Sequence, residues 1–285
     1  MKTTIDMPQM AANGLSENWL FKFCGNRHWQ ELCRSVGKKS AELRDDAQQR
    51  LYPTFIAISC RYSKPLSCFE ENGELEDIVE LSNFGRSFFH SKVQVKGAGG
   101  LLVQEMMTAF VARVKCGKND LKKSTPAASL VYDSKELVMA PLLLEASRML
   151  RKGELSTYVI EGRKLDLTRS GLDLVHKHEA SPYIDFNGAN LLYYASYPTI
   201  CDTGERLIIQ KQGLLHLKRD WSLATSTKAR DVFYYRNLDI GENILVRLNH
   251  IEQHANEVLL STTLLAEKDG LPIADVFTIK ELCLD

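Results

Sequence analysis

Two stretches of the chain, each opening on an Asn-Gly pair, carry the apolar spacing of a helix. In the first, Leu15, Trp19 and Phe23 recur every four residues, so one face is apolar. In the second, residues 191–195 are apolar on nearly every side, which is typical of a helix buried on most of its surface. We therefore expect two long helices that begin near the glycine of each pair, Gly14 and Gly188.

After each expected helix the period drops to two, which indicates β-strands. Apolar positions alternate through residues 54–59 and again through residues 244–249. Asp269-Gly270 predicts the tight turn of a last hairpin. Further matching segments are 85–90 with 229–234, and 101–114 with 258–266. Each half of the chain is thus expected to hold one short strand, one long helix and then several antiparallel strands.

This repeat predicts an α+β protein with a tandem (double) hotdog fold, in which each half is a long helix wrapped by a curved antiparallel sheet. An apolar helix needs a concave sheet to cover it, and the sheet needs the helix to fill its inner face. Two such units can pair along their sheet edges, which removes two exposed edges. We expect an N-terminal unit at 1–120, a linker segment at 121–155 and a C-terminal unit at 156–285.

Composition narrows the class of protein. Lys plus Arg equals Asp plus Glu, 36 against 36, which argues against a broad nucleic-acid surface. No apolar run is long enough to span a membrane, and the N-terminus carries no apolar signal region, so a cytoplasmic protein is expected. The seven cysteines form no CxxC pair, and nothing in the sequence calls for a metal or a cofactor.

The Asn-Gly pairs are the first candidate site. A helix N-terminus offers free N–H groups and a partial positive charge, which suit the developing oxyanion of a thioester. Asn13-Gly14 and Asn187-Gly188-Ala189 can bind such an oxygen, or the asparagines can simply cap their helices. Both alternatives stay open, as does the question whether one or both half-sites are functional.

Other candidates are single side chains. Tyr52, where a strand begins, is either a packing residue or a catalytic phenol. His28 suits the negative end of the first helix, and Glu17 and Asp185 suit the positive ends. The expected catalytic residues are Tyr52, Asp185, Asn187 and Gly188, and the expected substrate-binding residues are Asn13, Gly14, His28, Thr108, Ala189 and Arg230. The basic residues at 122–123 and 148–152 are a solvated surface or a landing site for phosphopantetheine phosphates or an acidic carrier protein.

Three segments, GLSENWLFKFCGNRHW, RLYPTF and DFNGANLLYYASYP, resemble the bifunctional acyltransferase/decarboxylases of polyketide biosynthesis, of the leinamycin-pathway type. That resemblance implies a double hotdog, a methylmalonyl- or malonyl-coenzyme A substrate that loses carbon dioxide, and an acyl carrier protein as partner. It also implies a tyrosine that accepts the acyl group, which by motif is Tyr52, with Tyr62 as the second choice. Pro53 directly after Tyr52 is a departure that puts this chemistry in doubt.

Three alternatives remain beside this interpretation. A hotdog thioesterase acting on acyl-coenzyme A or acyl carrier protein needs a carboxylate near a helix, such as Asp185 or Glu17. A dehydratase needs a histidine facing an acid across the two halves, and no such pair is evident. A non-catalytic acyl-binding protein needs neither. We also consider a homodimer, and we expect neither nucleic acid nor membrane as a partner.

Overall fold

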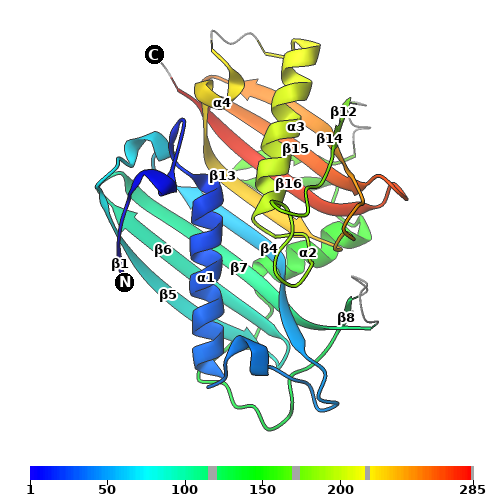
Figure 1. Cartoon of the computed structure of the whole chain (residues 1–285). Helices are drawn as coiled ribbons and strands as arrows, with labels where there is room; N and C mark the ends of the chain where they lie inside the picture. The colour runs from blue at the N-terminus through cyan, green and yellow to red at the C-terminus, as the bar shows by residue number, and fades with distance from the viewer. Residues whose placement is uncertain (115–120, 169–173, 216–218, 284–285) are drawn as a thin grey trace.

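The fold is built on one large antiparallel sheet with two long helices on the same face (Figure 1). A computed structural model of the chain describes residues 1–114, 121–168, 174–215 and 219–283. The helices are α1 (Glu17–Ser35) and α3 (Ser196–Gln212). No helix in these four ranges is both long and apolar enough to cross a membrane.

The strand order is mirrored about the middle of the sheet, β1-β5-β6-β7-β4 and then β13-β16-β15-β14-β12. The first half holds β1 (Lys2–Thr4), β4 (Leu51–Tyr62), β5 (Glu74–Phe84), β6 (Phe88–Gly97) and β7 (Gly100–Arg113). The second holds β12 (Leu174–His178), β13 (Thr225–Tyr234), β14 (Ile244–His254), β15 (Glu257–Ala266) and β16 (Pro272–Leu282). One helix lies on each half, so the expected tandem hotdog is confirmed (Figure 1).

The two units join where β4 pairs with β13. Only residues 57–61 of β4 take part, against 229–233 of β13. Each strand carries a bulge directly before this segment, at Ile56 in β4 and at Lys228 in β13. The two bulges therefore occupy matching places in the repeat. Beyond its bulge, β4 runs on with β7 on one side and no pairing to β13 on the other.

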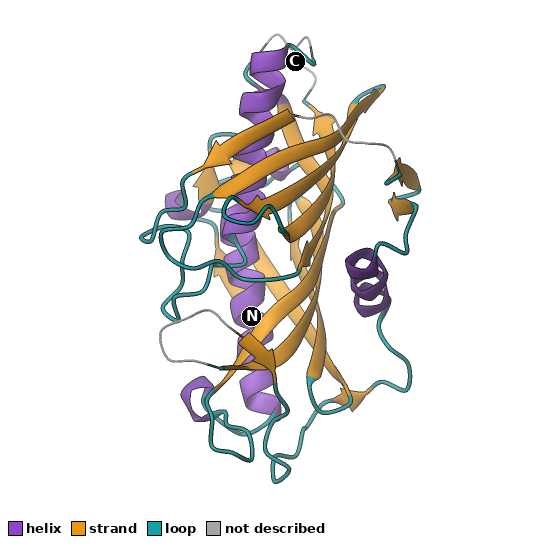
Figure 2. Ribbon diagram, turned by 90° about the vertical axis from the view of Figure 1, so that its right-hand side faces the viewer, coloured by secondary structure: helices purple, strands orange, loops and turns teal. Residues whose placement is uncertain are grey.

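The opposite face of the sheet is covered by the segment that links the two units (Figure 2). It contains α2 (Leu142–Lys152) and the hairpin of β10 (Thr157–Ile160) and β11 (Arg163–Asp166). Leu144, Ile160 and Leu165 pack there against a cluster that includes Phe233 and Phe277. The proposed linker, 121–155, ends before this hairpin, and its boundaries stay a prediction.

Shorter elements complete the chain. They are η1 (Met7–Gln9), β2 (Met10–Ala11), β3 (Gly14–Leu15), η2 (Ser40–Glu42), η3 (Leu66–Cys68), β8 (Leu121–Lys123), β9 (Lys135–Glu136) and α4 (Trp221–Ala224). The expected last hairpin is confirmed, because β15 and β16 pair across Asp269-Gly270. The expected match of residues 85–90 with 229–234 is wrong. Residues 85–90 span the turn from β5 to β6, whereas 229–234 belong to β13, the counterpart of β4.

One helix starts close to the expected glycine, Gly14, and the other does not. Helix α1 begins at Glu17, and its cap is Ser16, whose hydroxyl accepts the N–H of Trp19 at 3.2 Å. Asn13 instead lies in the turn between β2 and β3, and Gly14 is the first residue of β3, paired with Ala11. Helix α3 begins only at Ser196, so the prediction of a helix from Gly188 is wrong. An apolar run such as 191–195 cannot by itself distinguish a buried helix from a buried loop.

Candidate active site

A cleft of about 1140 Å³ opens where the two units meet beside the Ile56 bulge. Its walls come from the middle of α1, the first part of β4, the end of β7, helix α2, the loop 187–194 and the loop that follows β13. Because β4 is not paired with β13 here, the cleft reaches from the helix-covered side of the sheet to α2 on the other side.

Tyr52 stands in this cleft on β4, half-buried and opposite Val111 of β7. The guanidinium groups of Arg50 and Arg113 lie over its ring, with carbons 5.0 and 5.7 Å from the ring centroid. Cations over an aromatic face are held by the ring quadrupole. Pro53 follows in the part of β4 that has a neighbouring strand on one side only, a position where strands tolerate proline.

The loop that carries Asn187 forms a second wall of the cleft. The Asn187 side-chain oxygen accepts the N–H groups of Ala189 and Leu191 at 2.9 and 3.2 Å, which fixes a tight turn. Arg113 donates to the Ala189 carbonyl and so ties this turn to β7. Asn187, Gly188 and Ala189 all line the cleft, but the expected oxyanion site at a helix N-terminus is wrong, because no helix begins here. A role for these residues in substrate binding stays a prediction.

Asp185 lies outside the cleft lining and fastens the start of the same loop. Its carboxylate accepts the Ser181 N–H at 2.8 Å and lies 3.1 Å from Nε2 of His178. Burial alone would raise the pKa of Asp185, but the bonds from His178 and Ser181 outweigh it and lower the pKa. The contacts with Ser181 and His178 show that the Asp185 carboxylate holds the start of the loop in position.

The first Asn-Gly pair, Asn13-Gly14, is enclosed by neighbouring segments of the chain. The Asn13 side chain donates to the carbonyl oxygens of Ser222 and Thr225 at 3.0 and 3.2 Å. Gly14 has a φ of +116°, and a Cβ there would stand 2.4 Å from the Leu66 carbonyl oxygen. Only glycine fits such a conformation and such a contact. Neither residue lines the cleft, so the structure does not bring the two Asn-Gly pairs into one site.

His28 and Thr108 do meet, but beneath the cleft. His28 is fully buried on α1, with Nδ1 2.7 Å from the Ser91 hydroxyl and Nε2 3.0 Å from the Thr108 hydroxyl. Burial, helped by His90, lowers the pKa of His28 to about 3, so the ring is neutral near pH 7. With both ring nitrogens occupied internally, this pair holds α1 to the sheet.

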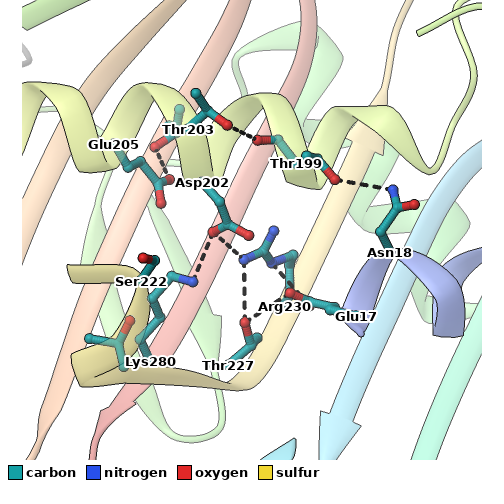
Figure 3. A network of polar contacts seen from close by, with 12 residues as sticks. Glu17, Asn18, Thr199, Asp202, Thr203, Glu205, Ser222, Thr227, Arg230 and Lys280 are labelled. Carbon is teal, nitrogen blue, oxygen red and sulfur yellow. Dashed lines mark hydrogen bonds and ion pairs between the residues drawn. The ribbon is translucent and has the colours of Figure 1, made fainter. Parts of the chain in front are cut away.

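Arg230 is the centre of a buried ionic cluster on the other side of the β4–β13 junction (Figure 3). Its Nη2 donates to Asp202 at 2.7 Å, and its Nε lies 3.4 Å from Glu17. Lys280 also contacts Asp202, at 2.8 Å. Burial opposes ionisation of Asp202, but Arg230 and Lys280 outweigh it and lower the pKa of Asp202 to about 2. Arg230 therefore joins α1, α3 and β13 and does not face the cleft.

Two further groups belong to this cluster. Glu205 is fully buried and accepts the Thr262 hydroxyl at 2.6 Å, and burial together with Asp202 raises the pKa of Glu205 to about 7. Tyr62, the second choice for an acyl acceptor, is buried and donates to Glu17 at 3.3 Å. Burial raises the pKa of the Tyr62 phenol, and neither Tyr62 nor Glu17 lines the cleft.

The sequence analysis named the basic residues at 122–123 and 148–152, of which Lys123, Arg148 and Arg151 line the cleft, but it missed Arg50, Arg113 and the aromatic rings at the base. Lys123 lies 4.0 Å over the Phe88 ring, and Arg151 lies 5.5 Å from the Tyr235 ring. Burial lowers the pKa of Lys123, and the positive charge of the nearby Arg148 lowers it further. Arg50 could have been found from the strand period, which places it on the same face as Tyr52. Within the described ranges, no group of three or more His, Cys, Asp or Glu side chains is placed to hold a metal ion.

No protein-family model and no curated protein matches the sequence. Solved structures do match along the whole chain. A putative oleoyl thioesterase from Lactobacillus plantarum covers 100% of this chain and 95% of its own, with a TM-score of 0.71 and 10% identity. This chain is a double-hotdog protein.

Two further solved structures share the double-hotdog architecture. The 12:0-ACP thioesterase from Umbellularia californica has a TM-score of 0.61 at 8% identity, and an acyl-ACP thioesterase from Bacteroides thetaiotaomicron has 0.57 at 11%. Each covers 99% of this chain and 96% of its own. At such identities the likeness establishes the fold, and the activity of this double-hotdog protein has to be argued from its own cleft.

Proposed function

We propose that this protein binds an acyl thioester of coenzyme A or of a carrier protein in the cleft and cleaves the thioester bond there. The observation that carries the proposal is the position of Tyr52, which stands in a large cleft between two guanidinium groups. A phenol that donates a hydrogen bond, with positive charge beside it, stabilises the oxyanion that forms when a thioester carbonyl is attacked.

The cations on the α2 side of the cleft support the choice of substrate. Lys123, Arg148 and Arg151 line this side, above apolar walls such as Leu144. Coenzyme A and phosphopantetheine both join an anionic phosphate to a long, mostly neutral arm, so they need cations at the entrance and a narrow cleft behind it. An acidic carrier protein would meet the same cations, which also assist encounter of oppositely charged partners.

Hydrolysis is the first reaction that we assign to the cleft. Water adds to the thioester carbonyl carbon, a C–O bond forms, the C–S bond breaks, and the thiolate takes up a proton. Tyr52 would donate to the carbonyl oxygen, and the lining carboxylates of Asp239, Glu242 and Asp269 are the groups that can take the proton from water. The thioesterase names of the three solved structures above favour this reaction.

Decarboxylating acyl transfer is the second candidate, and the surroundings of Tyr52 favour it. Arg50 and Arg113 beside the phenol could hold the carboxylate of a malonyl-type thioester until carbon dioxide leaves. Loss of carbon dioxide leaves an enolate, which takes up a proton from solvent at carbon. The acyl group would then move from sulfur to the Tyr52 oxygen as the C–S bond breaks, and the phenol proton would go to the departing coenzyme A thiolate. A carrier-protein thiol would finally take the acyl group from Tyr52 and return its proton to the phenol. This reaction is the one that the resemblance of the sequence motifs implies.

Incubation of the purified protein with methylmalonyl-coenzyme A and with saturated acyl-coenzymes A tests the proposal. Hydrolysis releases coenzyme A and the free acid, methylmalonate included, with one oxygen from labelled water in the product. Decarboxylating transfer releases carbon dioxide and leaves a propionyl group on the protein or on an added carrier protein. Mass spectrometry separates the two reactions. If the protein neither binds nor consumes any of these thioesters, the proposed function is wrong.

A further inference from the structure

The base of the cleft is a group of packed aromatic rings from both units. The ring of Tyr194 lies 4.0 Å from that of Phe55 on β4 and 4.8 Å from that of Tyr193, measured between centroids. Tyr197 and Tyr234 add a second contact at 4.9 Å. These five residues all lie in or beside the cleft, so an acyl group that enters past Tyr52 meets aromatic faces.

Tyr194 is anchored to α1 at its far end. Its hydroxyl donates to the Phe21 carbonyl at 2.9 Å. It reaches that carbonyl because residue 25 is glycine: a Cβ on Gly25 would stand 1.8 Å from the Tyr194 hydroxyl oxygen. Burial raises the pKa of Tyr194, so the phenol keeps the proton that makes this bond. The GNRHW and NLLYYASYP segments of the sequence thus meet at this contact.

Behind these rings lies a closed apolar core to which both units contribute. Phe21 and Cys24 are buried there in the same apolar cluster, and the buried ring of His28 lies 5.7 Å from Phe55. A longer acyl chain that continued in the direction from Tyr52 to Tyr194 would have to displace the Tyr194 ring and break its bond to Phe21. Tyr194 therefore blocks the way from the cleft into this core.

We propose that Tyr194, held in place through Gly25, limits the cleft to short acyl groups such as acetyl, propionyl or methylmalonyl. This inference rests on the proposed function, because it names the class of acyl thioester that the cleft accepts. An open apolar tunnel would tighten binding about fourfold for each methylene that it buries. With the tunnel blocked by Tyr194, chain extension brings no such gain.

The test uses thioether analogues that the protein cannot cleave. Dissociation constants are measured by titration calorimetry for coenzyme A carrying S-propyl, S-hexyl and S-dodecyl groups, at concentrations below micelle formation. We expect S-propyl-coenzyme A to bind, and the dissociation constant to stay level or rise along the series. A constant that falls steadily towards S-dodecyl would overturn the inference and leave the proposed function intact. Failure of all three to bind would instead contradict the proposed function.

Variants at the base of the cleft sharpen the result. Tyr194→Ala should tighten S-dodecyl-coenzyme A binding at least tenfold, whereas Tyr194→Phe, which keeps the ring, should retain the preference of the unaltered protein. If Tyr194→Ala does not fold, Phe55→Leu removes the ring that packs against Tyr194 and should show the same trend more weakly. The control is Tyr183→Ala, an exposed tyrosine outside the cleft. If the dissociation constant changes with acyl-chain length in the same way in every folded variant, Tyr194 does not limit the chain length.

Discussion

The bulges at Ile56 in β4 and at Lys228 in β13 create two equivalent positions in the repeat. The first position is open and the second is filled by side chains. Beside Ile56 the walls hold aromatic rings and cations, and the cleft stays open. Beside Lys228 the matching space is filled. Glu17 accepts Thr227 at 2.9 Å, the Ser226 hydroxyl accepts the Leu66 N–H at 3.1 Å, and Arg230 is buried next to them. Fold symmetry alone therefore does not make a site.

The difference between the two places follows from the residues after each bulge. Ile58 is an apolar core residue on β4, whereas its counterpart on β13 is Arg230, which must be paired because it is buried. Asp202 and Glu17 provide that pairing from the two helices, and their side chains take up the room that a ligand would need. One half of the repeat thus stabilises the joint between the units, and the other leaves a cleft.

Replacing Arg230 should have the largest effect on stability. In Arg230→Met, Asp202 and Glu17 lose a buried charge partner, and the free energy of unfolding should fall by about 3–5 kcal/mol. The turnover of the fraction that remains folded should change little. Denaturant unfolding measures the first and a thioester assay the second. Arg163→Met, which removes a half-exposed ion pair to Glu257, serves as the control and should cost less than about 1 kcal/mol.

Acid should destabilise the first unit through His28. Its pKa is lowered to about 3 in the folded protein, against about 6.5 for an unfolded chain, so the unfolded chain binds the proton more readily between these values. Stability should therefore be lost as pH falls from 6.5, by about 2 kcal/mol between pH 7 and pH 5. His28→Gln should remove this part of the pH dependence, while His254→Gln, at an exposed position, should not. If the free energy of unfolding depends on pH in the same way in both variants, His28 is not the group responsible for the loss of stability in acid.

Tyr52 lies in the open cleft beside Ile56, whereas Tyr62 belongs to the filled position around Arg230, so variants of the two tyrosines compare the two positions directly. Tyr52→Phe should lower turnover at least about tenfold, since one lost hydrogen bond in the transition state costs on the order of 1.4 kcal/mol. Tyr62→Phe loses the bond to Glu17 and a contact with the Cys60 thiol, so it should change thermal stability while leaving turnover nearly unchanged. If Tyr62→Phe lost turnover and Tyr52→Phe kept it, the reaction would have to take place beside Arg230 and not in the cleft.

Much of the fold could be predicted from the sequence, because periodicity reports burial. Trp19 and Phe23 indicated the first helix, and alternation at 54–59 indicated β4. The buried face of α1 is nevertheless a different one, formed by Leu20, Phe21, Cys24, Gly25, His28, Leu32 and Ser35, and Leu15 lies in β3 before the helix. The loop at 187–195 was missed, because its apolar residues face the core without a helix while the Asn187 side chain fixes the turn. Tyr52 was found as a candidate, and the structure places it in the cleft.

The roles of other residues depend on contacts between distant segments. Arg230 lies in a strand buried on both faces, so no alternation marks it as part of an ionic cluster. Tyr194 and Gly25 are far apart in the chain, and only the fold brings the hydroxyl against the glycine. The bulges at Ile56 and Lys228 leave no clear signal in the sequence, yet they set where the cleft opens.

The structure of a complex with S-propyl-coenzyme A tests most directly whether the acyl thioester binds at the open place. We predict that the thioether sulfur lies in the cleft between Tyr52 and the loop 187–192, with the phosphates near Lys123 and Arg148. A ligand seated beside Arg230 at the start of α1, or on a surface away from Tyr52, would contradict the account.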